Sequence, residues 1–235
     1  MHPDGDADPV AAMTNVLGIL GGTFDPIHYG HLELAREVKA ALRLATVRLI
    51  PAGDPPHRAV PVATAAHRLA MVELALAEYP DLEIDAREIR RAGPSYTVTT
   101  LGELRSEAPM RPLALIVGAD AFLGLPTWHR WTELFALAHV VIAARPGIAL
   151  EGALAPPLAG EYARRLRHDA TALTAAPAGS IVIQSTTPHP IAASAIRRDL
   201  ARGSAGLAAV RGLLPPSVLA YIDRNQLYRP RPDAT

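Results

Sequence analysis

The stretch Val16–Leu32, which reads VLGILGGTFDPIHYGHL, decides the fold of this chain. Val16–Leu20 is a short apolar run that ends in Gly21-Gly22, and such a run predicts a buried strand. Asp25-Pro26 is a turn signal, and the apolar residues of 32–42 that follow it keep helical spacing. The stretch therefore predicts a strand, a loop and a helix in direct succession.

The same alternation continues along the chain. Further strands are predicted over 47–50, 82–85, 113–117, 140–144 and 181–183. Further helices are predicted over 66–78, 94–106, 161–167, 193–202 and 217–225, the first with Leu69, Val72 and Leu76 on one side. Short strands that alternate with helices predict a Rossmann-like α/β fold, which is a doubly wound parallel sheet with helices on both faces and here a small C-terminal helical part.

One main domain is expected over residues 15–228. Residues 1–14 are polar and contain two prolines, which is typical of a flexible N-terminal arm. Residues 146–179 are rich in Ala, Pro and Gly and are expected to form a variable excursion, and residues 201–228 form the C-terminal helical part. Ligands of such sheets gather at the carboxyl ends of the strands, so the functional residues are expected just after them.

Composition excludes several classes of function. The 23 basic residues cancel the 23 acidic ones, so nucleic acid is not expected as a partner. The absence of cysteine removes disulfides and thiolate chemistry and fits the cytoplasm, and no apolar run approaches the roughly 18 residues of a membrane span. The only lysine is Lys39, so the chain has no Gly-Lys pair and no Walker A loop.

The loop after the first strand points to a phosphate site. Gly21-Gly22 lets the backbone approach a ligand closely, but the dinucleotide pattern Gly-x-Gly-x-x-Gly is missing. His28 and His31 are three residues apart at the predicted helix start, so their rings can project the same way, and a helix N-terminus favours anions. The alternative is that both histidines cap or pack the helix; a zinc site is disfavoured because no carboxylate lies at the usual spacing, so no metal ligand is assigned.

These residues resemble a known family. Residues 21–32 are similar to the first signature of the nucleotidyltransferases that carry a His-x-Gly-His motif, and among them to the nicotinate-nucleotide adenylyltransferases. Seven later segments resemble further motifs of that family, in the same order along the chain: 55–58, 94–97, 118–120, 126–128, 145–147, 191–197 and 226–228. The resemblance therefore covers about residues 16–228. One departure lies in the late motif, where Ala192 replaces the family's first serine and Ser194 its threonine.

The resemblance implies a nucleotidyltransferase domain that transfers the adenylyl group of ATP to nicotinate mononucleotide in NAD biosynthesis. The products would be deamido-NAD and pyrophosphate, formed by direct in-line attack without a covalent intermediate. Mg²⁺ is expected as the cofactor, arriving with ATP and held mainly by phosphates and water. ATP and nicotinate mononucleotide are the expected partners, no membrane partner is expected, and a homo-oligomer stays open.

The resemblance also assigns the residues around the phosphates. His28, His31 and Arg197 take the catalytic roles, as donors to the charge that develops on the phosphates. ATP and its phosphates are assigned to Gly22, Thr23, Phe24, Gly118, Asp120 and Ser194. Alternatives remain: Ser194 caps the last-motif helix, Arg197 is a surface arginine, and Asp120 caps a helix, binds ribose hydroxyls or orients a metal-bound water.

The nicotinate nucleotide is assigned to a second group of residues. Trp128 offers an indole on which a pyridine ring can stack, although core packing is the alternative for it and the stronger one for Trp131. The whole group comprises Thr97, Val98, Trp128, His129, Arg145, His57 and Arg58. Arg145 either reaches a phosphate or steadies its loop, and His57 and Arg58 either close over substrate or belong to a solvated loop.

Three rival functions are weighed. A phosphopantetheine adenylyltransferase would share the first motif but has no need of Trp128 or of residues 94–97. A nucleotide-sensing module without turnover is favoured slightly by the change at Ala192. A dehydrogenase is disfavoured by the missing dinucleotide pattern.

Overall fold

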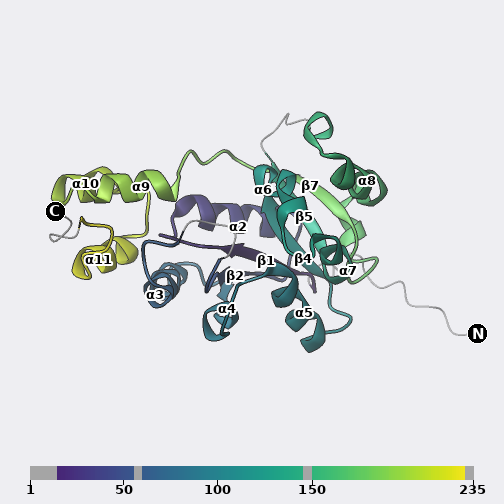
Figure 1. Ribbon diagram of the computed structural model, residues 1–235, viewed down its shortest axis with the longest axis horizontal. Coiled ribbons are helices and arrows are strands. Elements are labelled where there is room, and N and C mark those ends of the chain that lie inside the picture. The colour runs from purple at the N-terminus through teal and green to yellow at the C-terminus, as the bar shows by residue number, and fades with distance from the viewer. Residues whose placement is uncertain (1–14, 56–59, 145–149, 231–235) are drawn as a thin grey trace, which may run out of the picture. The chain divides into compact units, whose positions relative to one another are not determined.

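A computed structural model describes residues 15–55, 60–144 and 150–230. Over these residues the strands form one seven-stranded sheet, made of β1 (Leu17–Gly22), β2 (Thr46–Pro51), β3 (Leu82–Ile84), β4 (Leu113–Gly118), β5 (His139–Ala144), β6 (Leu166–Arg167) and β7 (Ile181–Ser185). Their order across the sheet is β3-β2-β1-β4-β5-β7-β6 (Figure 1). The pairings β1–β4, β4–β5, β5–β7 and β6–β7 are parallel. The predicted Rossmann-like α/β fold is therefore confirmed.

Helices connect the strands. In the described residues they are α2 (Tyr29–Ala41), α3 (Ala65–Leu76), α4 (Arg87–Arg90), α5 (Thr97–Glu107), α6 (Ala119–Leu123), α7 (Leu134–Leu137), α8 (Pro156–Arg165), α9 (Ala193–Leu200), α10 (Ser204–Ala209) and α11 (Pro216–Arg224). Short 3-10 turns lie at η1 (Leu125–Thr127), η2 (Trp131–Glu133), η3 (Glu151–Ala153) and η4 (Ala170–Leu173). Within the same ranges, no helix has both the length and the apolar character needed to cross a membrane.

Every strand and helix predicted from the sequence is present, with different ends. The helix predicted over 161–167 begins earlier, at Pro156, because proline fits the first turn of a helix, where its missing N–H costs nothing. The unpredicted helices α4, α6, α7 and α10 have four to six residues, too few to show a helical period. The two-residue strand β6 was missed for the same reason.

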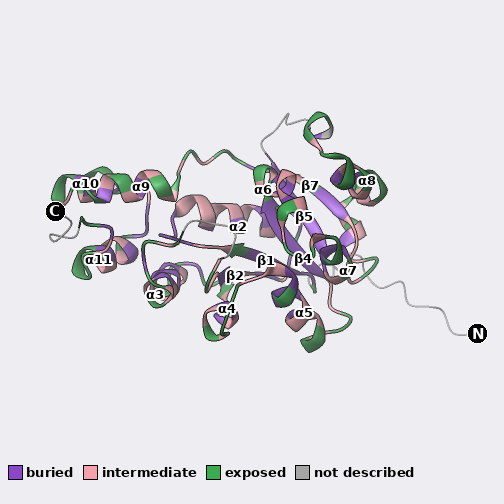
Figure 2. Cartoon of the chain, viewed as in Figure 1, coloured by how far each residue is buried: buried purple, intermediate pink, exposed green. Residues whose placement is uncertain are grey.

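The two central strands carry the core. All six residues of β5 are buried, and so are the first five of β4, whose last residue, Gly118, is exposed (Figure 2). Strands covered on both faces have continuous apolar sequences, as the runs at 113–117 and 140–144 do.

The described chain divides into two compact units. One unit contains residues 15–20, 37–48, 96–144 and 150–187, and the other contains residues 21–36, 49–55, 60–95 and 188–230. The loop after β1, with the histidine pair, and helices α3, α9, α10 and α11 belong to the second unit. The single domain over 15–228 stays a prediction, and the predicted N-terminal arm 1–14 lies outside the described residues.

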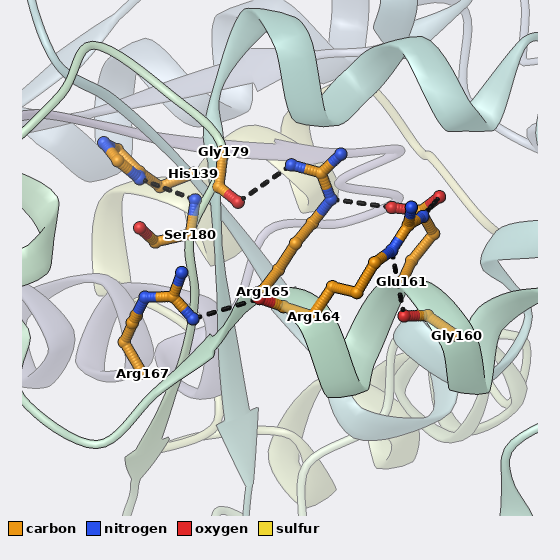
Figure 3. Close-up of polar contacts among 8 residues, drawn as sticks. All are labelled: His139, Gly160, Glu161, Arg164, Arg165, Arg167, Gly179 and Ser180. Atoms are coloured by element: carbon orange, nitrogen blue, oxygen red, sulfur yellow. Dashed lines mark hydrogen bonds and ion pairs between the residues drawn. The ribbon is translucent and has the colours of Figure 1, made fainter.

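In the first unit, an arginine ties α8 to the segment before β7 and to α7. Arg165, the last residue of α8, donates from Nε to Glu161 Oε2 at 2.7 Å and from Nη1 to the Gly179 carbonyl at 3.1 Å (Figure 3). Its guanidinium also lies 4.8 Å from the ring centroid of Phe135. Beside it, buried His139 accepts at Nδ1 from the Ser180 amide at 3.1 Å, so the segment before β7 is tied to β5.

In the second unit, α3 buries a different face from the predicted one. Of Leu69, Val72 and Leu76, only Val72 is buried; the buried side is Arg68, Met71, Val72 and Ala75. The prediction was wrong because it left out a charged residue. Arg68 is 1% exposed, and its guanidinium is satisfied by three backbone carbonyls, which allows an arginine on the inner face of the helix.

Candidate functional site

The two histidines of the first motif stack on each other. His28 immediately precedes α2, and His31 lies in its first turn. Their ring centroids are 3.7 Å apart with an interplanar angle of 23°, and the Phe24 ring meets His31 edge-on at 5.1 Å. Both rings therefore project the same way from the helix start, as their spacing predicted.

The glycine between the histidines makes room for the first ring. A Cβ atom on Gly30 would lie 3.0 Å from His28 Nδ1 and 3.1 Å from its Cε1. Such approaches are tighter than ordinary van der Waals contact, so a side chain at this position would push the ring. The requirement for glycine in His-x-Gly-His is thus steric.

Burial keeps the first histidine neutral. His28 is 5% exposed, and burial lowers the pKa of its ring from 6.5 to about 4. No described residue hydrogen-bonds its buried Nδ1 atom, and the same holds for the buried Oγ1 atom of Thr23. A neutral imidazole donates from one nitrogen and accepts at the other, so His28 can donate a hydrogen bond without carrying a charge.

The backbone of the loop leaves two amides without an acceptor among the described residues. The Gly22 carbonyl accepts from the Ala52 amide at 2.9 Å, and the Thr23 carbonyl accepts from Arg68 Nη1 at 2.8 Å. In a trans peptide the next N–H points opposite to the carbonyl, so the N–H groups of Thr23 and Phe24 point away from these partners. No residue of the described ranges accepts from either amide. Unused amides in a glycine-rich loop are suited to bind an anion.

Arg197 from the late motif contacts this same loop. It lies in the second turn of α9, and its Nη1 donates to the Asp25 carbonyl at 2.7 Å. The same atom is 3.9 Å from Asp25 Oδ2, and the side chain is 31% exposed. Arg197 is therefore partly exposed and held at the loop, and its phosphate role stays a prediction.

Ser194 does not cap its helix. The N-cap residue of α9 is Ala192, which offers no side-chain hydrogen bond, and Ser194 is exposed inside the first turn. The capping alternative is wrong because α9 begins at Ala193, two residues earlier than that role requires. A phosphate contact by Ser194 remains a prediction.

In the first unit, two of the predicted nicotinate segments meet. Tyr96, the N-cap residue of α5, places its ring 4.2 Å from the ring of His129, measured between centroids. Thr97 and Val98 are the first two residues of α5, so helix geometry gives their N–H groups no acceptor within the helix. The donors predicted for the nicotinate carboxylate thus come from adjoining segments.

The two tryptophans have different surroundings. Trp131 packs edge-on against buried Phe135 at 6.2 Å between centroids but is itself partly exposed, so the core role expected for it stays a prediction. Trp128 follows η1 and is partly exposed. A stacking role for Trp128 is compatible with this exposure and stays a prediction.

The residues after β4 are also accessible. Gly118 is the N-cap residue of α6, and Asp120 lies exposed in the first turn of that helix. No side-chain cap is formed, so the capping alternative for Asp120 is wrong. In the described part of the chain, no group of three or more His, Asp or Glu side chains is placed to hold a metal ion. The predicted residues His57, Arg58 and Arg145 lie outside the described residues.

Three residues at the loop were not assigned by the sequence. Asp25 is 5% exposed and accepts from Val62 N, Ala63 N and the Tyr228 hydroxyl, and Arg68 binds the Thr23 carbonyl. Two of them could have been found from the sequence: Asp25 lies within the first motif, and Arg68 lies on the same side of α3 as the buried Met71 and Val72. The sequence contains no signal for the hydrogen bond between Tyr228 and Asp25.

Comparisons with known proteins define first the class of this chain and then its family. The family model described as cytidylyltransferase-like matches residues 19–199, which is more than half of the chain. A protein of Dechloromonas aromatica (strain RCB) named "Probable nicotinate-nucleotide adenylyltransferase" is 51% identical over 219 residues, covering 92% of this chain and 99% of that protein. A protein of the same name from Halorhodospira halophila is 52% identical and covers 86% of this chain and 90% of its own length. The chain belongs to the nicotinate-nucleotide adenylyltransferase family within the cytidylyltransferase-like proteins.

Solved structures agree on the fold. The nicotinic acid mononucleotide adenylyltransferase of Plasmodium falciparum complexed with NaAD matches with a TM-score of 0.67 at 15% identity, covering 91% of this chain and 97% of that one. The same protein complexed with APC matches with a TM-score of 0.64 at 16% identity, over 91% and 96% of the two chains. At this identity the likeness bears on the fold alone.

Proposed function

We propose that this chain transfers the adenylyl group of ATP to nicotinate mononucleotide, giving deamido-NAD and pyrophosphate in NAD biosynthesis. The observation that carries the proposal is the stack of buried His28 on partly exposed His31, beside a loop with two amides that the described residues do not use. The names of the curated relatives supply the substrate class. A cytoplasmic location stays a prediction.

The reaction is a direct displacement at phosphorus. An oxygen of the nicotinate mononucleotide phosphate bonds to the α-phosphorus of ATP as the bond to the β-phosphate oxygen breaks, and pyrophosphate leaves with that electron pair. The attacking phosphate is already an anion near neutral pH, since its second pKa is ~6, so no strong general base is needed. Catalysis then rests on positioning and on stabilising the charge that builds up on the phosphate oxygens.

The histidine pair and the loop amides supply that stabilisation. We assign His28 and His31 as N–H donors to α- and β-phosphate oxygens, and Gly22, Thr23 and Phe24 as the backbone that holds the phosphates. Negative charge beside a buried imidazole favours its protonated form, so bound triphosphate raises the pKa of His28 above its ligand-free value of about 4. The ring can therefore donate more strongly in the bound state than in the free one.

Arg197 is assigned to the β- and γ-phosphates. One of its N–H groups donates to the Asp25 carbonyl, which orients the planar guanidinium, and the others have no acceptor among the described residues. Ser194 and the exposed Asp120 and Gly118 complete the set assigned to ATP. Mg²⁺ is expected to arrive with ATP, with phosphate oxygens and water as its main ligands.

The nicotinate end is assigned to the first unit. The amides of Thr97 and Val98 and the neighbouring His129 are donors for a carboxylate, and Trp128 offers a face for the pyridine ring. A carboxylate presents acceptors only, whereas nicotinamide presents an NH₂ group to the same donors. This difference is the proposed basis for preferring the acid.

A comparison of acceptors tests the function. Pyrophosphate release is measured with purified protein, ATP and Mg²⁺, and with nicotinate mononucleotide, nicotinamide mononucleotide or phosphopantetheine as the acceptor. The highest kcat/KM is expected with nicotinate mononucleotide. Faster release with phosphopantetheine would select the rival enzyme, and ATP binding without release from any acceptor would select the nucleotide-sensing module.

A further inference from the structure

A carboxylate behind the phosphate loop joins two distant parts of the second unit. Asp25 accepts from Val62 N at 2.8 Å through Oδ2 and from Ala63 N at 3.1 Å through Oδ1. Its Oδ1 atom also accepts the hydroxyl of Tyr228 at 2.8 Å, a partner 203 residues later in the chain. Burial and the Asp25 carboxylate both raise the pKa of Tyr228, so the hydroxyl keeps its proton and donates.

A buried arginine holds the other side of the loop. Arg68 Nη1 donates to the Thr23 carbonyl at 2.8 Å, Nη2 to the Gly53 carbonyl at 3.0 Å and Nε to the Ala63 carbonyl at 3.3 Å. Arg68 and Asp25 therefore both hold Ala63, one by its carbonyl and the other by its amide. The two side chains form a single network behind the loop.

The backbone between these anchors is strained. Phe24 has a φ of 49°, in the left-handed region that residues with a Cβ rarely adopt. Such a conformation persists where its surroundings hold it, and here the preceding carbonyl is bound by Arg68 and the following residue, Asp25, is held through its side chain and its carbonyl. The residue with this strained φ angle, Phe24, is also the one whose N–H is proposed to face the ligand.

The network also leaves positive charge at the loop. The Arg197 guanidinium lies 3.9 Å from the Asp25 carboxylate, and the Arg68 guanidinium binds the Thr23 carbonyl of the same loop, so two positive groups stand against one carboxylate. The neutral Tyr228 hydroxyl adds a hydrogen bond to the carboxylate without adding charge. The balance favours an anionic ligand at the adjacent amides.

We propose that Asp25, Arg68 and Tyr228 are positioning residues, which hold the Thr23–Phe24 peptide so that its amide faces the triphosphate of ATP. The tyrosine near the C-terminus thus controls phosphate binding at a loop near the N-terminus. The inference rests on the proposed function only in taking ATP as the ligand of the loop.

The test compares two tyrosines in the full chain. Tyr228→Phe removes the hydroxyl that donates to Asp25, and Tyr221→Phe removes a hydroxyl that lies 2.9 Å from His67 Nδ1 rather than on a residue of the loop. Calorimetry measures the Kd for ATP with Mg²⁺ and without an acceptor, and thermal unfolding gives the midpoint of each variant. Arg68→Lys, which keeps the charge but cannot reach three carbonyls at once, is the second variant.

The expected result is a Kd about fivefold higher for Tyr228→Phe, the factor that one ordinary hydrogen bond is worth, with Tyr221→Phe within twofold of wild type. A merely structural role would lower the unfolding midpoints of both tyrosine variants and leave ATP binding alike in the two. Unchanged ATP binding in both Tyr228→Phe and Arg68→Lys overturns the proposal. Because no acceptor is present, a wild-type protein that binds ATP but does not use nicotinate mononucleotide defeats the proposed function and leaves this comparison intact.

Discussion

Acidification should destabilise the protein through His28. Its ring is 5% exposed, and burial lowers its pKa from 6.5 to about 4. The His28 ring therefore binds a proton near pH 6.5 in the unfolded chain but only near pH 4 in the folded chain. The stability that the neutral ring contributes is fully present above pH 6.5 and is lost as the pH falls toward 4.

The size of this loss follows from the two pKa values. One pH unit between them corresponds to 1.36 kcal/mol, so the free energy of unfolding is expected to fall by about 2 kcal/mol at pH 5 and by about 3 kcal/mol near pH 4. A loss of that size is a large part of the free energy of unfolding of a typical domain, which is roughly 5–15 kcal/mol.

Urea unfolding at pH 7.5 and at pH 5.0 measures the effect in the wild type and in His28→Gln, which cannot titrate at this position. Other groups titrate in both proteins, among them buried His139, whose pKa is also lowered by burial. Only the difference between the two proteins therefore reports His28. NMR titration of the His28 ring in the ligand-free protein gives its pKa directly. A ring that titrates at 6.5, with equal losses in the two proteins, would refute the reasoning.

Three further predictions concern the site. His31→Ala should lower kcat for pyrophosphate release by about 10²–10³, because it removes one donor to the developing charge; near-normal turnover with intact circular dichroism would remove that role. Gly30→Ala places a Cβ 3.0 Å from His28 Nδ1 and should lower kcat at least about tenfold by moving the ring, with little change in the unfolding midpoint; unchanged kcat would show that the ring position is not critical. Trp128→Ala should raise the KM for nicotinate mononucleotide about 2- to 13-fold, equivalent to the 0.5–1.5 kcal/mol of a stacked ring pair, and leave the KM for ATP alone, whereas Trp131→Ala should lower the unfolding midpoint; equal kinetic effects of the two would contradict the assignment.

The fold could be predicted because each main element carries its own period. Val16–Leu20 and Leu113–Val117 are apolar runs of strand length, and the helices between them repeat apolar residues at helical spacing. The elements that were missed are too short to show a period, and the face of α3 was misplaced because Arg68 is charged and yet buried. A pattern of apolar residues cannot reveal an arginine whose guanidinium is satisfied by backbone carbonyls.

The candidate site was predictable only where its parts are close in sequence. The three-residue spacing of His28 and His31 was enough to place their rings together. The depressed pKa of His28 was not, because burial depends on residues from the whole unit. The bond from Tyr228 to Asp25 joins residues 203 positions apart, and no local pattern encodes such a pair.

The change at Ala192 can now be weighed by what the late motif does in the structure. Ala192 begins α9 without a side-chain cap, so the change removes a hydroxyl donor at the helix start. Arg197, five residues later, is oriented by the Asp25 carbonyl and by the approach of its guanidinium to the Asp25 carboxylate. Because these contacts do not involve the helix cap, we expect the loss of the hydroxyl to leave the guanidinium at Asp25. The change that favoured a module without turnover therefore removes one donor and leaves in place the contacts of the arginine to which we assign the phosphate role.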